Sequence, residues 1–140
     1  MTDDDVMMHR CEALGREAAA KGEAPVGAVI VQNGIIISEA QEASKSKQDI
    51  TCHAEIEAIR LATQKLHNRI LSDCELYTTH EPCVMCSYVI RFHRIRRVVY
   101  KNASEYLGGD TSSMPVLTTG EVPAHWSKPP VVERWDDAGG

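Results

Sequence analysis

Apolar positions follow a helical spacing at the start of the chain and form strand-like runs after it. A helix over residues 4–21 is indicated by apolar side chains that would share one face: Val6, Met7, Cys11, Leu14 and Ala18. Gly22 ends that pattern, and two apolar runs follow at residues 26–31 and 35–37. Asn33-Gly34 separates the two runs. Because Asn-Gly suits a two-residue hairpin turn, we expect the runs to pair as antiparallel strands.

Helical and extended patterns alternate further along the chain. The polar stretch 39–51 indicates a loop, and residues 54–66 are rich in helix formers with an apolar face. A strand is predicted over 75–79, a helix over 82–93 and a strand over 97–100. Glycines and prolines break up the remaining tail, where the pattern locates no helix or strand. Strands alternating with helices after a hairpin predict an α/β fold, a three-layer α/β/α sandwich around a mixed, roughly five-stranded sheet.

The composition is that of an ordinary folded domain. The chain has 140 residues, of which 43% are hydrophobic and 25% charged, enough for one layered core. Its longest apolar runs have the length of strands, and none is long enough to span a bilayer. The start, Met1 to Asp5, is acidic where a secretory signal needs a basic and then an apolar region. We therefore expect one cytoplasmic domain over residues 1–140, with no membrane association.

The five cysteines favour the same compartment. An odd number with one close pair, Cys83 and Cys86, is a poor disulfide framework for a secreted domain. Cys11, Cys52 and Cys74 are best interpreted as small buried apolar residues.

The charge balance argues against a general polyanion-binding surface. The formal net charge is −5, whereas such a surface needs a basic excess. A local basic cluster does exist, consisting of Arg91, Arg94, Arg96, Arg97 and Lys101. A solvated helix end that runs into a strand is the commoner explanation for such a cluster, and the alternative is a surface for RNA.

Two short segments carry the candidate chemistry, His53-Ala54-Glu55 and Pro82-Cys83-Val84-Met85-Cys86, each at the start of a predicted helix. Two cysteines three residues apart at a helix N-terminus can face one point, where the helix dipole favours thiolate. With the imidazole of His53 they form a neutral, three-ligand set for Zn²⁺. The open fourth position holds water, whose pKa zinc lowers to about 7. Glu55, two residues from a ligand, is placed to carry the proton to a leaving amine.

Other interpretations of these segments exist. A lone Cys-x-x-Cys also occurs in redox motifs and in structural zinc ribbons, and a lone His-x-Glu is usually surface chemistry. A closed structural zinc site would need a fourth ligand, for which Cys52, Cys74 and His80 are the nearby candidates. The two segments together, in this order and each opening a helix, favour catalytic zinc.

The chain resembles the cytidine deaminase-like superfamily, in the branch with bacterial tRNA adenosine deaminases, guanine deaminases and fungal cytosine deaminase. The resemblance spans about residues 25–100 and rests on segments 25–29, 51–55, 76–79, 81–86 and 94–100. It implies one zinc ion per chain held by His53, Cys83 and Cys86, with Glu55 as proton shuttle. It also implies that the backbone N–H of Ala54 contacts the substrate ring and that the protein is a homodimer.

Two departures from that family bear on the substrate. Many relatives carry an asparagine, which holds the base or the sugar, where this chain has Glu42. If Glu42 points into the pocket, its carboxylate can only accept hydrogen bonds and would suit a substrate with N–H or O–H donors; the alternative is a solvated loop residue. The tRNA-editing relatives also end in a basic helix, whereas this chain ends in an acidic tail.

The tail itself, residues 120–140, is a candidate lid over a zinc pocket, either that of its own chain or that of a neighbouring subunit. Trp135 could stack on a planar base, and Asp136 or Asp137 could accept from its N–H groups, as the resemblance to fungal cytosine deaminase suggests. The competing interpretation is that Trp135 is a packing anchor at the chain end.

Three functions are consistent with the sequence. The first is hydrolytic deamination of a small nucleobase, nucleoside or related heterocycle, with release of ammonia. The second is deamination of adenosine to inosine in a tRNA anticodon loop, which the acidic tail makes less favoured without excluding it. The third is a non-catalytic binding module stabilised by zinc.

Overall fold

The computed structural model describes residues 1–126 and 128–137. Helices and strands alternate after an opening helix and hairpin, as the sequence predicts. In chain order the elements are α1 (Asp3–Ala20), β1 (Gly27–Gln32), β2 (Ile35–Gln41), α2 (Ala54–Leu66), β3 (Cys74–His80), α3 (Val84–Phe92), β4 (Arg97–Asn102) and β5 (Val131–Arg134). Residues 127 and 138–140 of the expected tail lie outside the described residues.

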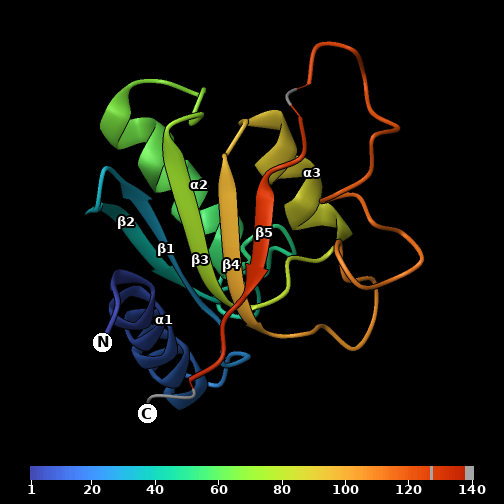
Figure 1. Ribbon diagram of the computed structural model, residues 1–140. Coiled ribbons are helices and arrows are strands. Elements are labelled where there is room, and N and C mark those ends of the chain that lie inside the picture. The colour runs from blue at the N-terminus through green and yellow to red at the C-terminus, as the bar shows by residue number, and fades with distance from the viewer. Residues whose placement is uncertain (127, 138–140) are drawn as a thin grey trace.

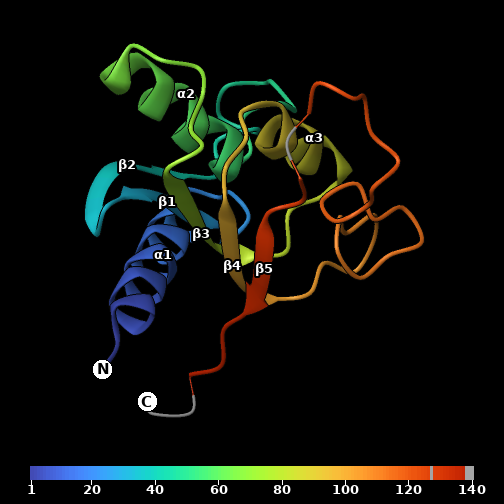
Figure 2. The same cartoon turned by 45° about the horizontal axis from the view of Figure 1, so that its top comes forward.

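The five strands form one mixed sheet in the order β2-β1-β3-β4-β5. β1 pairs antiparallel with β2 and β3, while β3, β4 and β5 run parallel to one another. In Figures 1 and 2, α1 covers one face of this sheet and α2 and α3 cover the other. The predicted three-layer α/β/α sandwich with a mixed, five-stranded sheet is therefore confirmed.

Strand β1 shows why the central runs are continuously apolar. Ala28 and Ile30 pack into the core shared with α2 and α3, whereas Val29 and Val31 pack into the core under α1. A strand covered on both faces needs apolar residues at every position instead of an alternating pattern. Gly27 begins this strand because α1 passes close by: a Cβ there would lie 2.2 Å from the carbonyl oxygen of Cys11.

The hairpin forms as predicted but is longer. Asn33 and Gly34 both have positive φ angles, 51° and 78°, as the tight turn requires. β2 continues to Gln41, so the predicted loop 39–51 was wrong in its first residues. Ser38, which is polar but buried, stabilises this extension by donating a hydrogen bond from Oγ to the carbonyl of Ala58 at 2.7 Å. Pairing with β1 satisfies the backbone hydrogen bonds of this polar segment. The spacing of apolar residues in the sequence does not reveal such pairing.

Two residues of the basic cluster, Arg91 and Arg97, are held by contacts within the protein, whereas Arg94 and Arg96 are exposed. Arg91 is 1% exposed and donates hydrogen bonds to the carbonyls of Val116 and Thr119. Arg97 forms ion pairs with Asp4 and with Glu75. The interpretation of the cluster as a solvated helix end was therefore wrong for these two arginines. Within residues 1–126 and 128–137, no helix is both long and apolar enough to cross a membrane.

Candidate active site

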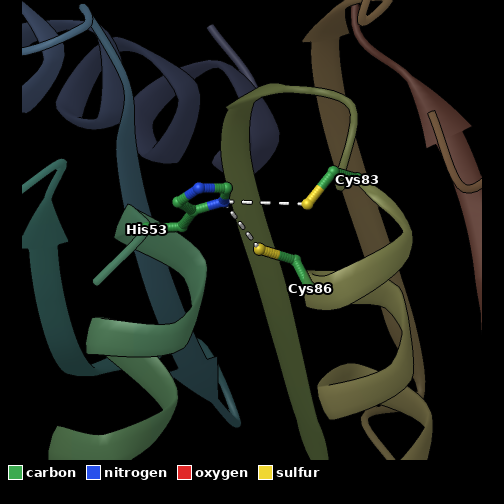
Figure 3. A group of neighbouring side chains, drawn as sticks. All are labelled: His53, Cys83 and Cys86. Atoms are coloured by element: carbon green, nitrogen blue, oxygen red, sulfur yellow. Dashed lines mark hydrogen bonds between the residues drawn. The ribbon is translucent and has the colours of Figure 1, made fainter. Parts of the chain in front are cut away.

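The candidate metal ligands lie where two helices begin at the same end of the sheet. His53 directly precedes α2, while Cys83 directly precedes α3 and Cys86 lies in its first turn. Because only Glu81-Pro82 links β3 to Cys83, this strand carries both cysteines to the start of α2. The three side chains point toward one another in Figure 3. Helix N-termini stabilise thiolate, the form of cysteine that binds a metal.

The spacing of the three side chains fits zinc. His53 Nδ1 lies 3.7 Å from Cys83 Sγ and 3.4 Å from Cys86 Sγ. A tetrahedral zinc ion with Zn–N and Zn–S bonds of about 2.1 and 2.3 Å separates such ligand atoms by about 3.6 Å. These residues are positioned to bind one zinc ion. Among the described residues no fourth His, Cys, Asp or Glu joins this cluster, so the arrangement favours a catalytic over a closed structural site.

The proton equilibria of the three side chains are strongly coupled. Contacts with Cys86 and with His53 lower the pKa of Cys83 to about 4. The contact with Cys83 raises the pKa of His53 to about 9, and the pKa of Cys86 rises because Cys83 and burial disfavour a second thiolate. Two thiolates and a neutral imidazole cannot share this space without a positive charge among them. A dication supplies that charge, and binding it releases protons.

Glu55 is buried beside this cluster and lacks a protein partner for one of its oxygens. Its side chain lines the same pocket as His53 and Cys83. The residue is 4% exposed, and Oε1 has no hydrogen-bond partner among the described residues. Burial raises the pKa of Glu55 to about 7. A carboxyl group that titrates near neutrality can both accept and return a proton.

The pocket in front of the cluster is small and acidic. Its volume is about 230 Å³, below the roughly 300–1,000 Å³ typical of sites for drug-sized ligands, which suits a single ring system. Glu42 lines it, is 7% exposed and accepts a hydrogen bond from Ser44 Oγ at 2.5 Å. Of the two interpretations of Glu42, the solvated loop residue was wrong. Its contact with substrate stays a prediction.

Ala54 is the first residue of α2 and is fully buried. A backbone N–H in the first turn of a helix has no acceptor within that helix. This position is compatible with the predicted contact between the Ala54 N–H and a substrate ring.

The described residues of the tail, 120–126 and 128–137, do not line the pocket of their own chain. Trp135 is 8% exposed and packs in the cluster under α1, on the face opposite α2 and α3. Its Nε1 donates to Asp5 at 2.8 Å, and Asp137 lies 3.3 Å from His9 of α1. Asp136 lines a surface pocket with Trp135 and away from the zinc ligands. Trp135 packs as the anchor interpretation predicts, so the lid hypothesis was wrong for this chain's own pocket. For the pocket of a neighbouring subunit it stays a prediction.

Sequence reasoning missed Glu81, which organises the wall of the pocket. Glu81 is 2% exposed, and its carboxylate accepts from the backbone N–H groups of Ser104, Asp110 and Thr111. Gly108 lies so close that a Cβ there would be 2.4 Å from the carboxylate. The sequence did hold a signal for this role. Glu81 directly precedes Pro82-Cys83, and the loop after the next strand contains Gly108-Gly109, which allows a close approach.

Comparison with known proteins agrees with this geometry. The tRNA-specific adenosine deaminase of Aquifex aeolicus (strain VF5) is 43% identical over 102 residues, which are 73% of this chain and 68% of that protein. A solved structure from work on A-to-I editing by tRNA:A34 deaminases at the wobble position of transfer RNA has a TM-score of 0.86 at 30% identity. It covers 96% of this chain and 100% of its own.

Guanine deaminase from Bacillus subtilis is also similar, with a TM-score of 0.69 and 40% identity over 71% of this chain and 64% of that chain. The family described as the cytidine and deoxycytidylate deaminase zinc-binding region matches residues 1–102, the part that contains His53, Glu55, Cys83 and Cys86. The match covers well over half of the sequence. This chain therefore belongs to the cytidine and deoxycytidylate deaminase family of zinc-binding deaminases.

Proposed function

We propose that this protein is a zinc-dependent deaminase that converts adenosine to inosine in RNA of the tRNA anticodon type. The observation that carries the proposal is the similarity over nearly the whole chain to a structure from work on tRNA:A34 deaminases. The 43% identity to a tRNA-specific adenosine deaminase supports it. This order reverses the ranking from the sequence, which placed a free nucleobase first because of the acidic tail.

The residues of the site divide the chemistry among them. His53, Cys83 and Cys86 would hold zinc, which when bound would lower the pKa of a water molecule to about 7 and so provide the attacking hydroxide. Glu55, buried and with one oxygen unpaired, takes a proton and returns it to the departing amine. The pocket of about 230 Å³ admits one base, so a base within RNA must leave its stack to enter. Ammonia leaves and a carbonyl replaces the amine.

Deamination of a free base is the second candidate, and Glu42 favours it. The buried Glu42 carboxylate can only accept hydrogen bonds, so it suits a ring that presents N–H groups at the pocket wall. The 40% identity to guanine deaminase is close to that with the tRNA enzyme, so identity alone does not separate the two candidates. The expected homodimer and cytoplasmic location stay predictions for either candidate.

An ammonia-release assay on the zinc-loaded protein tests both candidates. The substrates are a tRNA anticodon stem-loop with adenosine at the wobble position, the same stem-loop with guanosine there, adenosine, cytidine, guanine, cytosine and isocytosine. Glu55→Gln is the matched control, because it keeps the shape of the side chain and removes its proton transfer. Inosine formed in the stem-loop by wild type and absent with Glu55→Gln supports the first candidate.

Turnover of a free base with an untouched stem-loop would instead establish the second candidate. If no substrate releases ammonia above the Glu55→Gln background, both are wrong, and the zinc-stabilised binding module becomes the better hypothesis.

A further inference from the structure

His80, the last residue of β3, lies at the boundary between two pockets. One is the zinc pocket, which it lines together with Glu55 and Cys83. The other, of about 260 Å³, is lined by His80 together with Arg16 and Asn102 among others. A substrate larger than one ring that enters the zinc pocket has this imidazole at its side.

The hydrogen bonds of the neighbouring Thr79 fix which ring nitrogen of His80 carries the proton. Thr79 is 4% exposed, and its Oγ1 accepts from the backbone N–H of Gly27 at 3.3 Å. The hydroxyl proton then needs an acceptor, because an unpaired buried donor is costly. Among the described residues that acceptor is His80 Nδ1, which lies 2.9 Å from Oγ1.

With Nδ1 accepting, the neutral ring carries its proton on Nε2. Partial burial lowers the pKa of His80, so the neutral ring is the form present at neutral pH. The Nε2–H group has no hydrogen-bond acceptor among the residues that the structure describes, which leaves it available to a ligand.

We propose that His80 determines substrate specificity by donating a hydrogen bond from Nε2–H to an acceptor atom of the bound substrate. The acceptor is a ring nitrogen, a carbonyl oxygen or an attached ribose oxygen. Glu42, in the same pocket, offers only acceptors, so the two side chains together select a substrate with a donor for Glu42 and an acceptor for His80. This inference rests on the proposed deaminase function, since it concerns the substrate of that same site.

Two variants of His80 separate the hydrogen bond from the shape of the side chain. Gln places an amide N–H near the position of Nε2, whereas Leu fills similar space without a donor. We expect His80→Leu to lower kcat/KM by about tenfold to a hundredfold, the range for leaving one buried partner unpaired. His80→Gln should remain within about threefold of wild type. His125→Leu, in an exposed loop, is the control and should change nothing.

Zinc content should be the same in all three variants. Both His80 variants remove the Nδ1 acceptor of the Thr79 hydroxyl and should lower the unfolding temperature alike, so a loss of kcat/KM confined to His80→Leu indicates a substrate contact and not a structural role. The substrates are those of the ammonia assay. A loss on free bases places the acceptor on the ring, and a loss confined to nucleoside or stem-loop places it on the ribose. Equal kcat/KM for His80→Leu and wild type on every substrate that is turned over overturns the proposal.

A second measurement does not depend on activity. In long-range ¹H–¹⁵N spectra of the zinc-loaded protein with labelled histidine, the ring signals missing from His80→Gln belong to His80. We expect Nδ1 without a proton and Nε2 with one, and Thr79→Val should weaken this preference. A protonated Nδ1 in wild type refutes the inference. If no substrate is deaminated but the expected tautomer is found, the deaminase proposal has failed. The inference that His80 presents an Nε2–H donor at the boundary of the two pockets would still hold.

Discussion

Replacing Glu81 with Gln should destabilise the protein through the loop that forms one wall of the active-site pocket. The carboxylate lies at the end of β3 and binds the loop after β4. Its Oε1 accepts from Ser104 N at 3.0 Å and Thr111 Oγ1 at 2.7 Å, and its Oε2 accepts from Asp110 N at 2.8 Å and Thr111 N at 2.6 Å. Four donors thus converge on one buried side chain.

The size of the effect follows from what an amide can replace. A Gln at this position retains one acceptor oxygen, which can serve Asp110 and Thr111. Its NH₂ group then faces the Ser104 N–H, where two donors meet, while the hydroxyl of Thr111 can turn to accept. The variant loses the charge on its hydrogen bonds and leaves one buried N–H unpaired. At about 1–3 kcal/mol for the unpaired donor and a similar amount for the lost charge assistance, the expected loss is about 2–6 kcal/mol.

Urea unfolding of the zinc-loaded protein, followed by tryptophan fluorescence, measures this loss as a lower midpoint at unchanged slope. Glu105→Gln is the matched control, since Glu105 is an exposed residue of the same loop and the charge change is identical. We expect its midpoint to equal that of wild type. A midpoint for Glu81→Gln that also equals wild type would refute the argument that this carboxylate holds the loop.

The role of the Glu81 carboxylate can also be tested through the pH dependence of the free energy of unfolding. Burial alone would raise the pKa of Glu81, but the hydrogen bonds from Thr111, Asp110 and Ser104 outweigh it and lower the pKa. A carboxylate whose pKa falls on folding adds stability above the unfolded value, near 4.5, and loses that contribution as the pH falls through the folded value. The difference between wild type and Glu81→Gln should therefore be full at neutral pH and shrink in acid.

Other expectations follow from the site and the tail. Glu55→Gln should keep one zinc per chain by metal analysis, while its turnover falls about a hundredfold or more. Cys83→Ala should instead lose the metal. Equal turnover of Glu55→Gln and wild type would contradict the role of Glu55 in proton transfer. Trp135→Ala should lower the free energy of unfolding by about 3–5 kcal/mol, because a buried indole and its bond to Asp5 are lost, and Trp135→Phe should cost less. In both tail variants kcat/KM of the folded fraction should be unchanged, and a selective loss of kcat/KM would revive the lid hypothesis.

The elements that sequence reasoning located well are those with a local physical signature. The predicted helix over residues 54–66 coincides with α2, because helix formers and one apolar face determine it locally. Asn33-Gly34 located the hairpin because few other pairs adopt two positive φ angles readily. The metal ligands were identifiable for the same reason: His53, Cys83 and Cys86 each lie at a helix start, where spacing in sequence becomes spacing in three dimensions.

The parts that sequence reasoning could not place depend on distant partners. β5 has four residues and exists because β4 offers an edge for parallel pairing, with Val131 opposite Arg97 and Arg134 opposite Tyr100. Trp135 follows this strand, so the same pairing decides that it reaches α1 and not the pocket. Glu81 has an ordinary appearance in the sequence, and its role is defined by loop residues more than 20 positions away. Long-range pairing leaves no local periodicity to detect.

The placement of the basic residues limits how an RNA substrate could be held. Arg96 pairs with Glu75 at 2.5 Å, Arg97 pairs with the same carboxylate at 2.8 Å, and Lys101 pairs with Glu12 at 2.8 Å. To bind a phosphate, these cations would first have to break charge-assisted bonds inside the protein, which costs affinity at each contact. Each phosphate contact to a single strand steepens the salt dependence of binding by about 0.7 in log–log slope, and these three residues are expected to add little to it. If RNA is the substrate, these three cations contribute little to its affinity, and the contacts of Glu42 and His80 would decide the choice of ring in RNA as they would for a free base.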